Sequence, residues 1–197
     1  IDISGYKWLD TNGDGSWTGT EAGYAGWTIY LGIDKNGDGI AETAITSTTT
    51  NSTGQYQFLN LGPLTDPSWK YIVYEAKNAS GDTEADWTRT FNSSGYYAVD
   101  ATSGNTLTGL RDAGSGETGS DGNFGNFKNI DISGYKWLDT NGDGSWNGTE
   151  AGYAGWTINL GIDQNGDGTA ETTIASTTTN STGQYQFLNC LLYTSPS

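Results

Sequence analysis

Four short acidic turns rich in glycine carry the strongest chemical signal in the chain. The first reads DTNGDG from Asp10 and continues to Glu21, so it fits the pattern D-x-[DN]-x-[DN]-G-x5-E in full. Oxygen-bearing side chains at alternate positions of such a loop converge on one point, because the backbone coils around that point. Calcium is bound in this way, whereas magnesium prefers fewer protein ligands and more water. The first loop therefore predicts a calcium site.

A second turn of this type begins at Asp34, but its last carboxylate, Glu42, stands at position nine rather than twelve. This loop either completes a site of its own with water or lends oxygens to the first loop. A plainer interpretation is that both are hairpin turns, since Asn-Gly and Asp-Gly favour tight turns. Helices would flank the loops of an EF-hand or a dockerin, whereas the residues after Glu21 alternate as in a strand. Three formal charges in an exposed loop predict weak binding, with Kd on the order of 10⁻⁴ to 10⁻³ M.

Each loop has a copy later in the chain, because residues 1–60 recur at 130–189 with six substitutions. The predicted calcium ligands of the first copy are Asp10, Asn12, Asp14, Ser16, Thr18 and Glu21, then Asp34, Asn36, Asp38, Ile40 and Glu42. Those of the second copy are Asp139, Asn141, Asp143, Ser145, Asn147 and Glu150, then Asp163, Asn165, Asp167, Thr169 and Glu171. A repeat at a fixed offset predicts one fold unit per copy.

The repeat also predicts the domain boundaries: a complete unit at 1–129 and the first half of a second unit at 130–189. The residues CLLYTSPS at 190–197 resemble a translated sequencing adapter and are set apart from the predicted fold. We interpret both ends of the chain as cuts in a longer protein. Only Lys128 and Asn129 separate the units, so a stiff junction between neighbouring repeats is predicted.

The composition is acidic and poor in catalytic side chains. A formal net charge of −15 with only eight Lys and Arg argues against nucleic acid or an anionic membrane as partner. There is no His, and the one cysteine, Cys190, falls in the tail, which excludes triads, thiol chemistry and imidazole metal sites. Paired carboxylates would still suit a glycosidase, but the calcium loops account for most of the acids. We therefore expect a secreted or cell-surface protein that is not an enzyme.

Apolar and polar residues alternate with a period of two between turns, and no helical period is sustained. This pattern predicts an all-β sandwich. Tyr30 is replaced by Asn159 in the second copy, so we expect that face of its strand to be wet. The predicted strands are 3–9, 26–33, 44–49, 55–61, 69–75, 96–101, 107–111 and 123–128.

Several motifs occur in one order: GYKWLDTNGDG, GWTIYL, STGQYQFLNL, YIVYE and NFGNF. In this order they resemble the B-type domains of serine-aspartate repeat surface proteins, which are similar to collagen-adhesin B-type domains. The resemblance covers 3–128 and, truncated, 132–188. It implies tandem immunoglobulin-like or prealbumin-like β-sandwiches, the second truncated, that serve as calcium-rigidified spacers in secreted or cell-surface proteins. The glycine-rich stretch between Glu75 and Phe124 departs from the pattern.

The collagen-adhesin relatives often carry a Lys to Asn isopeptide bond promoted by a Glu. The resemblance places Lys7, Glu75 and Asn126 in the corresponding segments, and strand parity allows all three to face inward. The alternative is that Tyr6 and Trp8 face inward, which would leave Lys7 in water and Glu75 with a structural role.

Two functions are compared beside the excluded enzyme. The first is a calcium-stabilised spacer or stalk repeat of an adhesin-like protein, with calcium and neighbouring repeats as partners and a glycan or host protein bound elsewhere in the full-length protein. The second is a carbohydrate-binding module, for which the eight Trp and twelve Tyr would form a stacking platform. Trp17 and Trp87 are the residues expected to be exposed for that purpose. Neither function requires this part of the chain to insert into a membrane.

Overall fold

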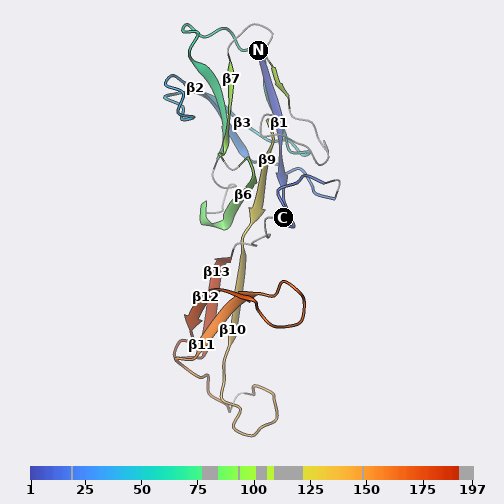
Figure 1. Ribbon diagram of the computed structural model, residues 1–197, viewed down its shortest axis with the longest axis vertical. Helices are drawn as coiled ribbons and strands as arrows, with labels where there is room; N and C mark the ends of the chain where they lie inside the picture. Colours follow the sequence, from blue (N-terminus) through green and yellow to red (C-terminus); the bar gives the residue numbers. More distant parts are fainter. Residues whose placement is uncertain are drawn as a thin grey trace. The chain divides into compact units, whose positions relative to one another are not determined.

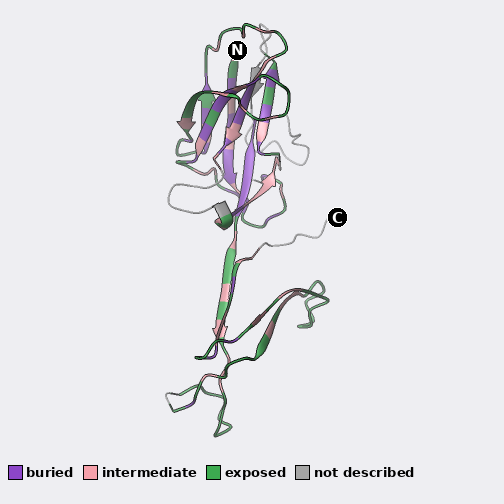
Figure 2. Ribbon diagram, turned by 90° about the vertical axis from the view of Figure 1, so that its left-hand side faces the viewer, coloured by how far each residue is buried: buried purple, intermediate pink, exposed green. Residues whose placement is uncertain are grey.

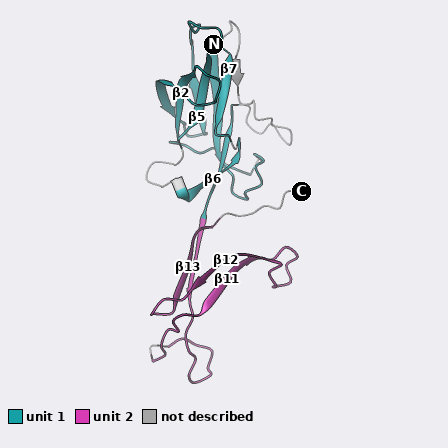
Figure 3. Cartoon of the chain, turned by 60° about the vertical axis from the view of Figure 1, so that its left-hand side comes forward, with its two compact units in different colours: residues 1–129, 191–197 teal, residues 130–190 magenta. Residues whose placement is uncertain are grey.

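The computed structural model describes residues 1–18, 20–76, 84–92, 94–100, 106–108, 122–147 and 149–190. These residues divide into two compact units, Ile1–Asn129 and Ile130–Cys190 (Figure 3). The boundary agrees with the start of the sequence repeat. Within the described part of the chain, no helix is long and apolar enough to cross a membrane.

Unit 1 is a β-sandwich (Figure 1). Its first sheet has the order β4-β1-β9-β6, with β8 also paired to β1. Its second sheet has the order β3-β2-β5-β7. The strands of the first sheet are β1 (Asp2–Leu9), β4 (Gln55–Phe58), β6 (Trp87–Phe91), β8 (Thr106–Thr108) and β9 (Phe124–Lys128). Those of the second are β2 (Thr28–Asp34), β3 (Thr43–Thr49), β5 (Lys70–Glu75) and β7 (Tyr96–Asp100), and a short 3-10 helix, η1 (Glu84–Asp86), precedes β6.

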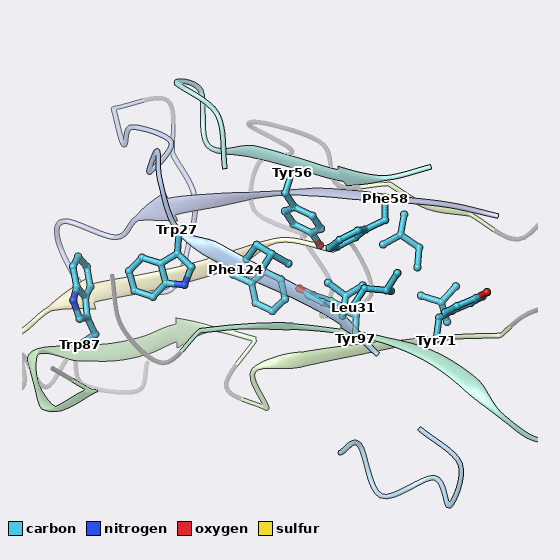
Figure 4. Close-up of a cluster of buried hydrophobic side chains, with 12 residues drawn as sticks. Trp27, Leu31, Tyr56, Phe58, Tyr71, Trp87, Tyr97 and Phe124 are labelled. Carbon is cyan, nitrogen blue, oxygen red and sulfur yellow. The ribbon is translucent and has the colours of Figure 1, made fainter. Parts of the chain in front are cut away.

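The core lies between the two sheets and is rich in aromatic side chains (Figure 4). Alternation along β2 turns one face of the strand into this core: Ile29 and Leu31 are fully buried, while Tyr30 between them is 37% exposed. The prediction of a wet face is therefore confirmed at Tyr30. Burial of each such aliphatic side chain stabilises the fold by about 1.5 to 3 kcal/mol. The other core residues include Trp27, Tyr56, Phe58, Tyr71, Val73, Trp87, Tyr97 and Phe124.

The first and last strands of unit 1 are neighbours. β1 pairs in parallel with β9, with Lys7 opposite Phe124 and Leu9 opposite Asn126. On its other edge β1 pairs antiparallel with β4. The predicted strands therefore exist, apart from small boundary shifts, but β6 was not predicted at all. The end of the predicted strand 107–111 and residue 101 lie outside the described residues.

Unit 2 repeats the first half of unit 1. β10 (Ile130–Tyr135) pairs with β13 (Gln184–Cys190), and β11 (Thr157–Ile162) pairs with β12 (Thr172–Thr178). The registers copy those of β1 with β4 and of β2 with β3, down to the irregularity at Gly32, which recurs at Gly161. Cys190 closes β13 opposite Ile130, and residues 191–197 lie outside the described part of the chain.

The core positions of unit 2 are open to solvent. Much of unit 2 is coloured as exposed in Figure 2. Trp27 is fully buried in unit 1, whereas its copy Trp156 is 47% exposed. The reason is that β2 in unit 1 lies between β3 and β5, while β11 in residues 130–147 and 149–190 has only β12 as a neighbour. The all-β fold is confirmed, and the strands of unit 2 in residues 130–147 and 149–190 correspond to β1, β2, β3 and β4 of unit 1.

Candidate metal loops

The first aspartate of each loop organises the turn around it. Asp10 follows β1 and is fully buried. Its Oδ1 accepts the N–H of Gly13 at 2.6 Å, and its Oδ2 accepts the N–H of Gly15 at 2.8 Å. Gly15 has φ +71°, a conformation that L residues rarely adopt, so glycine is required there. Asp34, Asp139 and Asp163 accept the same pair of glycine N–H groups in their own loops.

The next two polar side chains continue the network. In the first loop, Oδ1 of Asn12 accepts the N–H of Asp14, and Oδ1 of Asp14 accepts the N–H of Ser16 at 2.7 Å. The amide of Asn12 also donates to Oδ2 of Asp14 at 2.8 Å. Equivalent bonds recur in the other three loops, with Ile40, Ser145 and Thr169 in the place of Ser16. All four turns therefore share one geometry.

The closing glutamate reaches the same place in both loop types. Oε1 of Glu21 accepts the N–H of Thr11 at 2.9 Å, and Oε2 of Glu42 accepts the N–H of Lys35 at 2.6 Å. Thr11 and Lys35 are each the second residue of their loop. The glutamate is thus bound identically from position twelve or from position nine. Glu150 and Glu171 repeat these bonds at 2.9 and 2.7 Å.

Three of the four loops gather their carboxylates closely. In each of these loops, one carboxylate oxygen from every acid lies within 4.8 Å of the others. The three groups are Asp34, Asp38 and Glu42; Asp139, Asp143 and Glu150; and Asp163, Asp167 and Glu171. Among the described acids, Asp10, Asp14 and Glu21 do not meet this distance. The second loop therefore gathers its own carboxylates rather than extending toward the first.

The remaining predicted ligands lie at the rim. Thr18 donates its N–H to Oε2 of Glu21 at 3.1 Å, and its hydroxyl bonds to that of Thr20 at 3.2 Å. Oδ1 of Asn147, the counterpart of Thr18, accepts from the hydroxyl of Thr149 at 2.6 Å. Both side chains thus bond within the loop rim rather than to the acids.

Most of the loop acids that show a pKa shift titrate lower than usual. Burial raises the pKa of Asp34, but the backbone N–H groups of Gly37 and Gly39 outweigh it, so the pKa is lowered. Backbone N–H donors, with Gly144 and Gly168 foremost, lower the pKa of Asp139 and Asp163. Glu21 is the exception, because burial raises its pKa. Low pKa values keep carboxylates charged, and charged oxygen donors suit calcium.

Trp17 fastens the first loop to the sandwich. Its ring stacks on Trp8 of β1 with centroids 5.2 Å apart and planes 6° apart, and its Nε1–H donates to the carbonyl of Glu21 at 3.1 Å. Trp17 is only 3% exposed, so the prediction of an exposed ring is wrong. The prediction for Trp87 is also wrong, because its ring meets Trp27 edge-on in the core and is 8% exposed. The loop folds back over β1, which strand parity alone does not reveal.

The second loop covers the outer face of the other sheet. A Cβ at Gly32 would lie 2.5 Å from the Cβ of Ala41, so glycine allows the close approach of the loop end to β2. Beside it, Ile72 of β5 is fully buried although it shares parity with the partly exposed Tyr74. Farther along the loop, Gly39 lies against the ring of Tyr96 on β7. This loop therefore contacts β2 and β7.

A buried charge cluster lies beside the first loop. Nζ of Lys7 is 3.2 Å from Oε2 of Glu75, and Nε–H of Arg89 donates to Oε1 of Glu75 at 2.7 Å. Lys7 is fully buried, 4.5 Å above the ring centroid of Trp27, and burial lowers its pKa to about 8 against the attraction of Glu75. Asn126 is 1% exposed, and its Oδ1 has no hydrogen-bond partner in the described interior.

The alternative with Lys7 in water is wrong. Both Lys7 and Trp8 are buried, because the core covers one face of β1 and Trp17 covers the other. Sequence reasoning missed Arg89, which lies on the unpredicted strand β6. Its only signal was a basic residue among aromatic and threonine residues.

The chain is similar to three serine-aspartate repeat-containing proteins. Protein F of Staphylococcus epidermidis (strain ATCC 12228 / FDA PCI 1200) is 34% identical over 187 residues, which is 95% of this chain and 10% of the relative. Protein C of Staphylococcus aureus (strain MRSA252) is 34% identical over 188 residues, which is 95% of this chain and 18% of the relative. Protein D of Staphylococcus aureus (strain Newman) is 30% identical over 185 residues, or 94% of this chain and 12% of the relative.

These matches confirm the resemblance to serine-aspartate repeat proteins, and the chain spans less than a fifth of the length of each of the three. No family model matches. Among solved structures, the shaft pilin SpaA from Lactobacillus rhamnosus GG aligns over 94% of this chain and 81% of its own, with 14% identity and a TM-score of 0.37.

Proposed function

We propose that this chain is a calcium-stabilised spacer repeat of a secreted or cell-surface protein, with a mechanical rather than a catalytic role. One observation carries the proposal: four loops share one hydrogen-bond network. In each loop the closing glutamate accepts the N–H of the second loop residue, whether the glutamate stands at position twelve or at position nine. A hairpin turn has no need of that closing glutamate. Similarity to serine-aspartate repeat proteins over nearly the whole chain supports the spacer role.

Calcium would act here by binding the folded loops and not the unfolded chain. Charged oxygens from Asp34, Asp38 and Glu42 would hold the ion in the second loop, and equivalent residues would hold it in the two loops of unit 2. In the first loop, Asp10, Asp14 and Glu21 would have to draw closer together around the ion. Binding to the folded form alone adds stability. Trp17 of the first loop stacks on Trp8 of β1. Calcium that stabilises this loop would therefore also stabilise the sheet against which the loop packs.

Isothermal titration with calcium tests this proposal on the full chain. We expect up to four sites with Kd on the order of 10⁻⁴ to 10⁻³ M. Glu42→Gln should weaken one site, because one charged oxygen is lost from a three-carboxylate group. Asp100→Asn is the matched control, since it removes one charge from an exposed ion pair with Lys70, outside the loops. A titration without heat of binding, or equal effects of the two variants, contradicts the proposal.

For the buried cluster we propose an ion cluster rather than a covalent bond. The isopeptide bond implied by the resemblance needs a neutral Lys7 amine and a protonated Glu75. The lowered pKa of Lys7 favours the first requirement. Arg89 opposes the second, because its Nε–H already donates to Oε1 of Glu75 at 2.7 Å and occupies one of the two oxygens that would carry the proton. Asn126 then contributes a buried amide and remains unmodified.

The carbohydrate-binding alternative loses the platform on which it was based. Trp17 and Trp87 both have their rings in contacts with other tryptophans and are not available for stacking on a sugar. A glycan site on unit 1 would therefore need other aromatic residues.

A further inference from the structure

A cavity of about 550 Å³ opens on the outer face of the four-stranded sheet in unit 1. Its walls include Tyr30, Tyr74 and Tyr96, with Arg89 and Glu75 at one side and Ile40 from the second loop at another. The volume falls within the range of small-molecule sites, about 300 to 1,000 Å³. None of the proposed calcium ligands apart from Ile40 lines it.

The three tyrosines form a row across adjacent strands. Tyr30 of β2 pairs in register with Tyr74 of β5, and Tyr74 pairs with Tyr96 of β7. The rings of Tyr30 and Tyr74 stack with centroids 5.3 Å apart and planes 18° apart. Tyr30 remains 37% exposed. Such a row offers apolar ring surface together with hydroxyl groups that both donate and accept hydrogen bonds.

Arg89 gives the cavity a positive group. Its Nε binds Glu75 at 2.7 Å, and its side chain is 29% exposed. A guanidinium carries five N–H donors in a planar fork that matches a carboxylate. Lys7 also pairs with Glu75, so Arg89 does not have that carboxylate to itself. In a chain of net charge −15, the exposed part of the Arg89 side chain is therefore a local positive group for a negative ligand.

We propose that this cavity binds an acidic sugar, with the pyranose ring against the tyrosine row and its carboxylate on Arg89. Tyrosine hydroxyls suit the polar edge of a sugar, and their rings suit its apolar face. Two of the three tyrosines are on interior strands of the sheet, β2 and β5, so an extended peptide lying there finds no free strand edge to pair with. A compact polar ligand fits these features better than a peptide.

Calcium on the second loop should strengthen this binding, and this step rests on the proposed function. Gly39 and Ile40 wall the cavity, and the loop residues next to them include three carboxylates gathered within 4.8 Å. Without a cation these charges repel a negative ligand; with calcium bound the repulsion is offset. The ion would also order the wall that contacts Tyr96.

The test uses the full chain and two matched probes, methyl β-D-glucuronide and the uncharged methyl β-D-glucoside, measured by saturation-transfer NMR. We expect the glucuronide to bind with Kd on the order of 1 mM in calcium, the weak affinity of one small ring. Chelator should weaken binding about fivefold, and the glucoside should bind at least about tenfold more weakly, because it lacks the partner of Arg89. A calcium titration of the same sample reports the metal sites separately.

Tyr30→Asn is the sharpest variant, since the equivalent position of the second copy already holds Asn159 and the residue is exposed. It should weaken glucuronide binding about fivefold by removing one ring contact. Arg89→Lys should reduce the preference for the glucuronide, because lysine keeps the positive charge but loses the planar fork that matches a carboxylate. Ile45→Thr, an exposed change on β3 away from the cavity, should leave binding unchanged.

Four results overturn the proposal. They are equal binding of both probes, no binding of either while calcium still titrates, competition by N-acetylglutamate at the same concentration as the glucuronide, and unchanged binding by Tyr30→Asn. Failure of the calcium titration with glucuronide binding intact contradicts the proposed function and the calcium step alone. Thermal melts establish that Arg89→Lys is folded, and Tyr30→Asn decides the question if it is not.

Discussion

Glu21→Gln separates the contribution of calcium from that of the first loop's own hydrogen bonds. Glutamine keeps an oxygen for the N–H of Thr11 but turns an amide toward the N–H of Thr18, which Oε2 of Glu21 now accepts at 3.1 Å. Loss of that bond should cost about 1 kcal/mol in any buffer. The loss of one charged oxygen should matter only when calcium is present.

The size of the calcium effect follows from mass action. At 10 mM calcium and Kd on the order of 10⁻⁴ to 10⁻³ M, one site stabilises the folded state by about 1.4 to 2.7 kcal/mol. For a unit of this size that corresponds to a Tm increase of roughly 5 to 12 °C. Glu21→Gln should therefore lower the Tm far more in calcium than in chelator.

The assay is thermal unfolding of the full chain in calcium and in chelator, followed by near-ultraviolet circular dichroism. Unit 2 is the same in every variant, so its signal cancels in the comparison. Asp100→Asn is the control for charge removal, because its side chain is 63% exposed and lies outside the loops. If wild type and Glu21→Gln gain the same Tm from calcium, the first loop is not a calcium site.

Two further predictions concern the buried cluster. The pKa of Lys7 is lowered to about 8 in the folded state and is near its ordinary 10.5 in the unfolded state. Between these two values the unfolded chain binds more protons than the folded chain, so stability increases with pH. The free energy of unfolding should therefore rise by roughly 2 kcal/mol from pH 8 to pH 10. Lys7→Met should remove this rise in pH-dependent denaturant melts; a rise that persists assigns it to another group. The intact mass of the wild type should show no deficit, whereas Arg89→Met should allow the Lys7–Asn126 bond and lose about 17 Da, the mass of ammonia. A deficit in the wild type contradicts the ion cluster, and no deficit in Arg89→Met excludes the bond altogether.

Periodicity was sufficient for most strands of unit 1, because a half-buried strand requires alternation, as Ile29, Tyr30 and Leu31 show. It failed at β6, where Trp87 is buried but the next four residues are all half-buried and show no alternation. Such a pattern arises where an edge strand contributes Arg89 to the gap between the sheets, and no local signal marks it.

The turn formed by each loop could be predicted because its spacing is local, running from Asp10 to Glu21 within twelve residues, and calcium binding by these residues stays a prediction. The sequence did not predict that Glu42 would accept the N–H of the second loop residue as Glu21 does. The path of the loop, and not the number of residues, decides where a carboxylate lies. The prediction that Trp17 is exposed was wrong for a similar reason. Its burial depends on a loop folding back onto Trp8, and loop paths are tertiary properties.

The two loops of unit 1 contact different sheets, and this predicts how their effects combine. The first joins β1 to β9, because Asp10 follows β1 and its N–H donates to the carbonyl of Asn126 at 3.0 Å. The second contacts β2 and β7. Sites without shared partners add within about 0.5 kcal/mol. The destabilisation of Glu21→Gln plus Glu42→Gln, measured by denaturant melts in calcium, should therefore equal the sum of the single variants. If the second loop instead lent its oxygens to the first, either single change would remove the common ion, and the double variant would be little less stable than each alone.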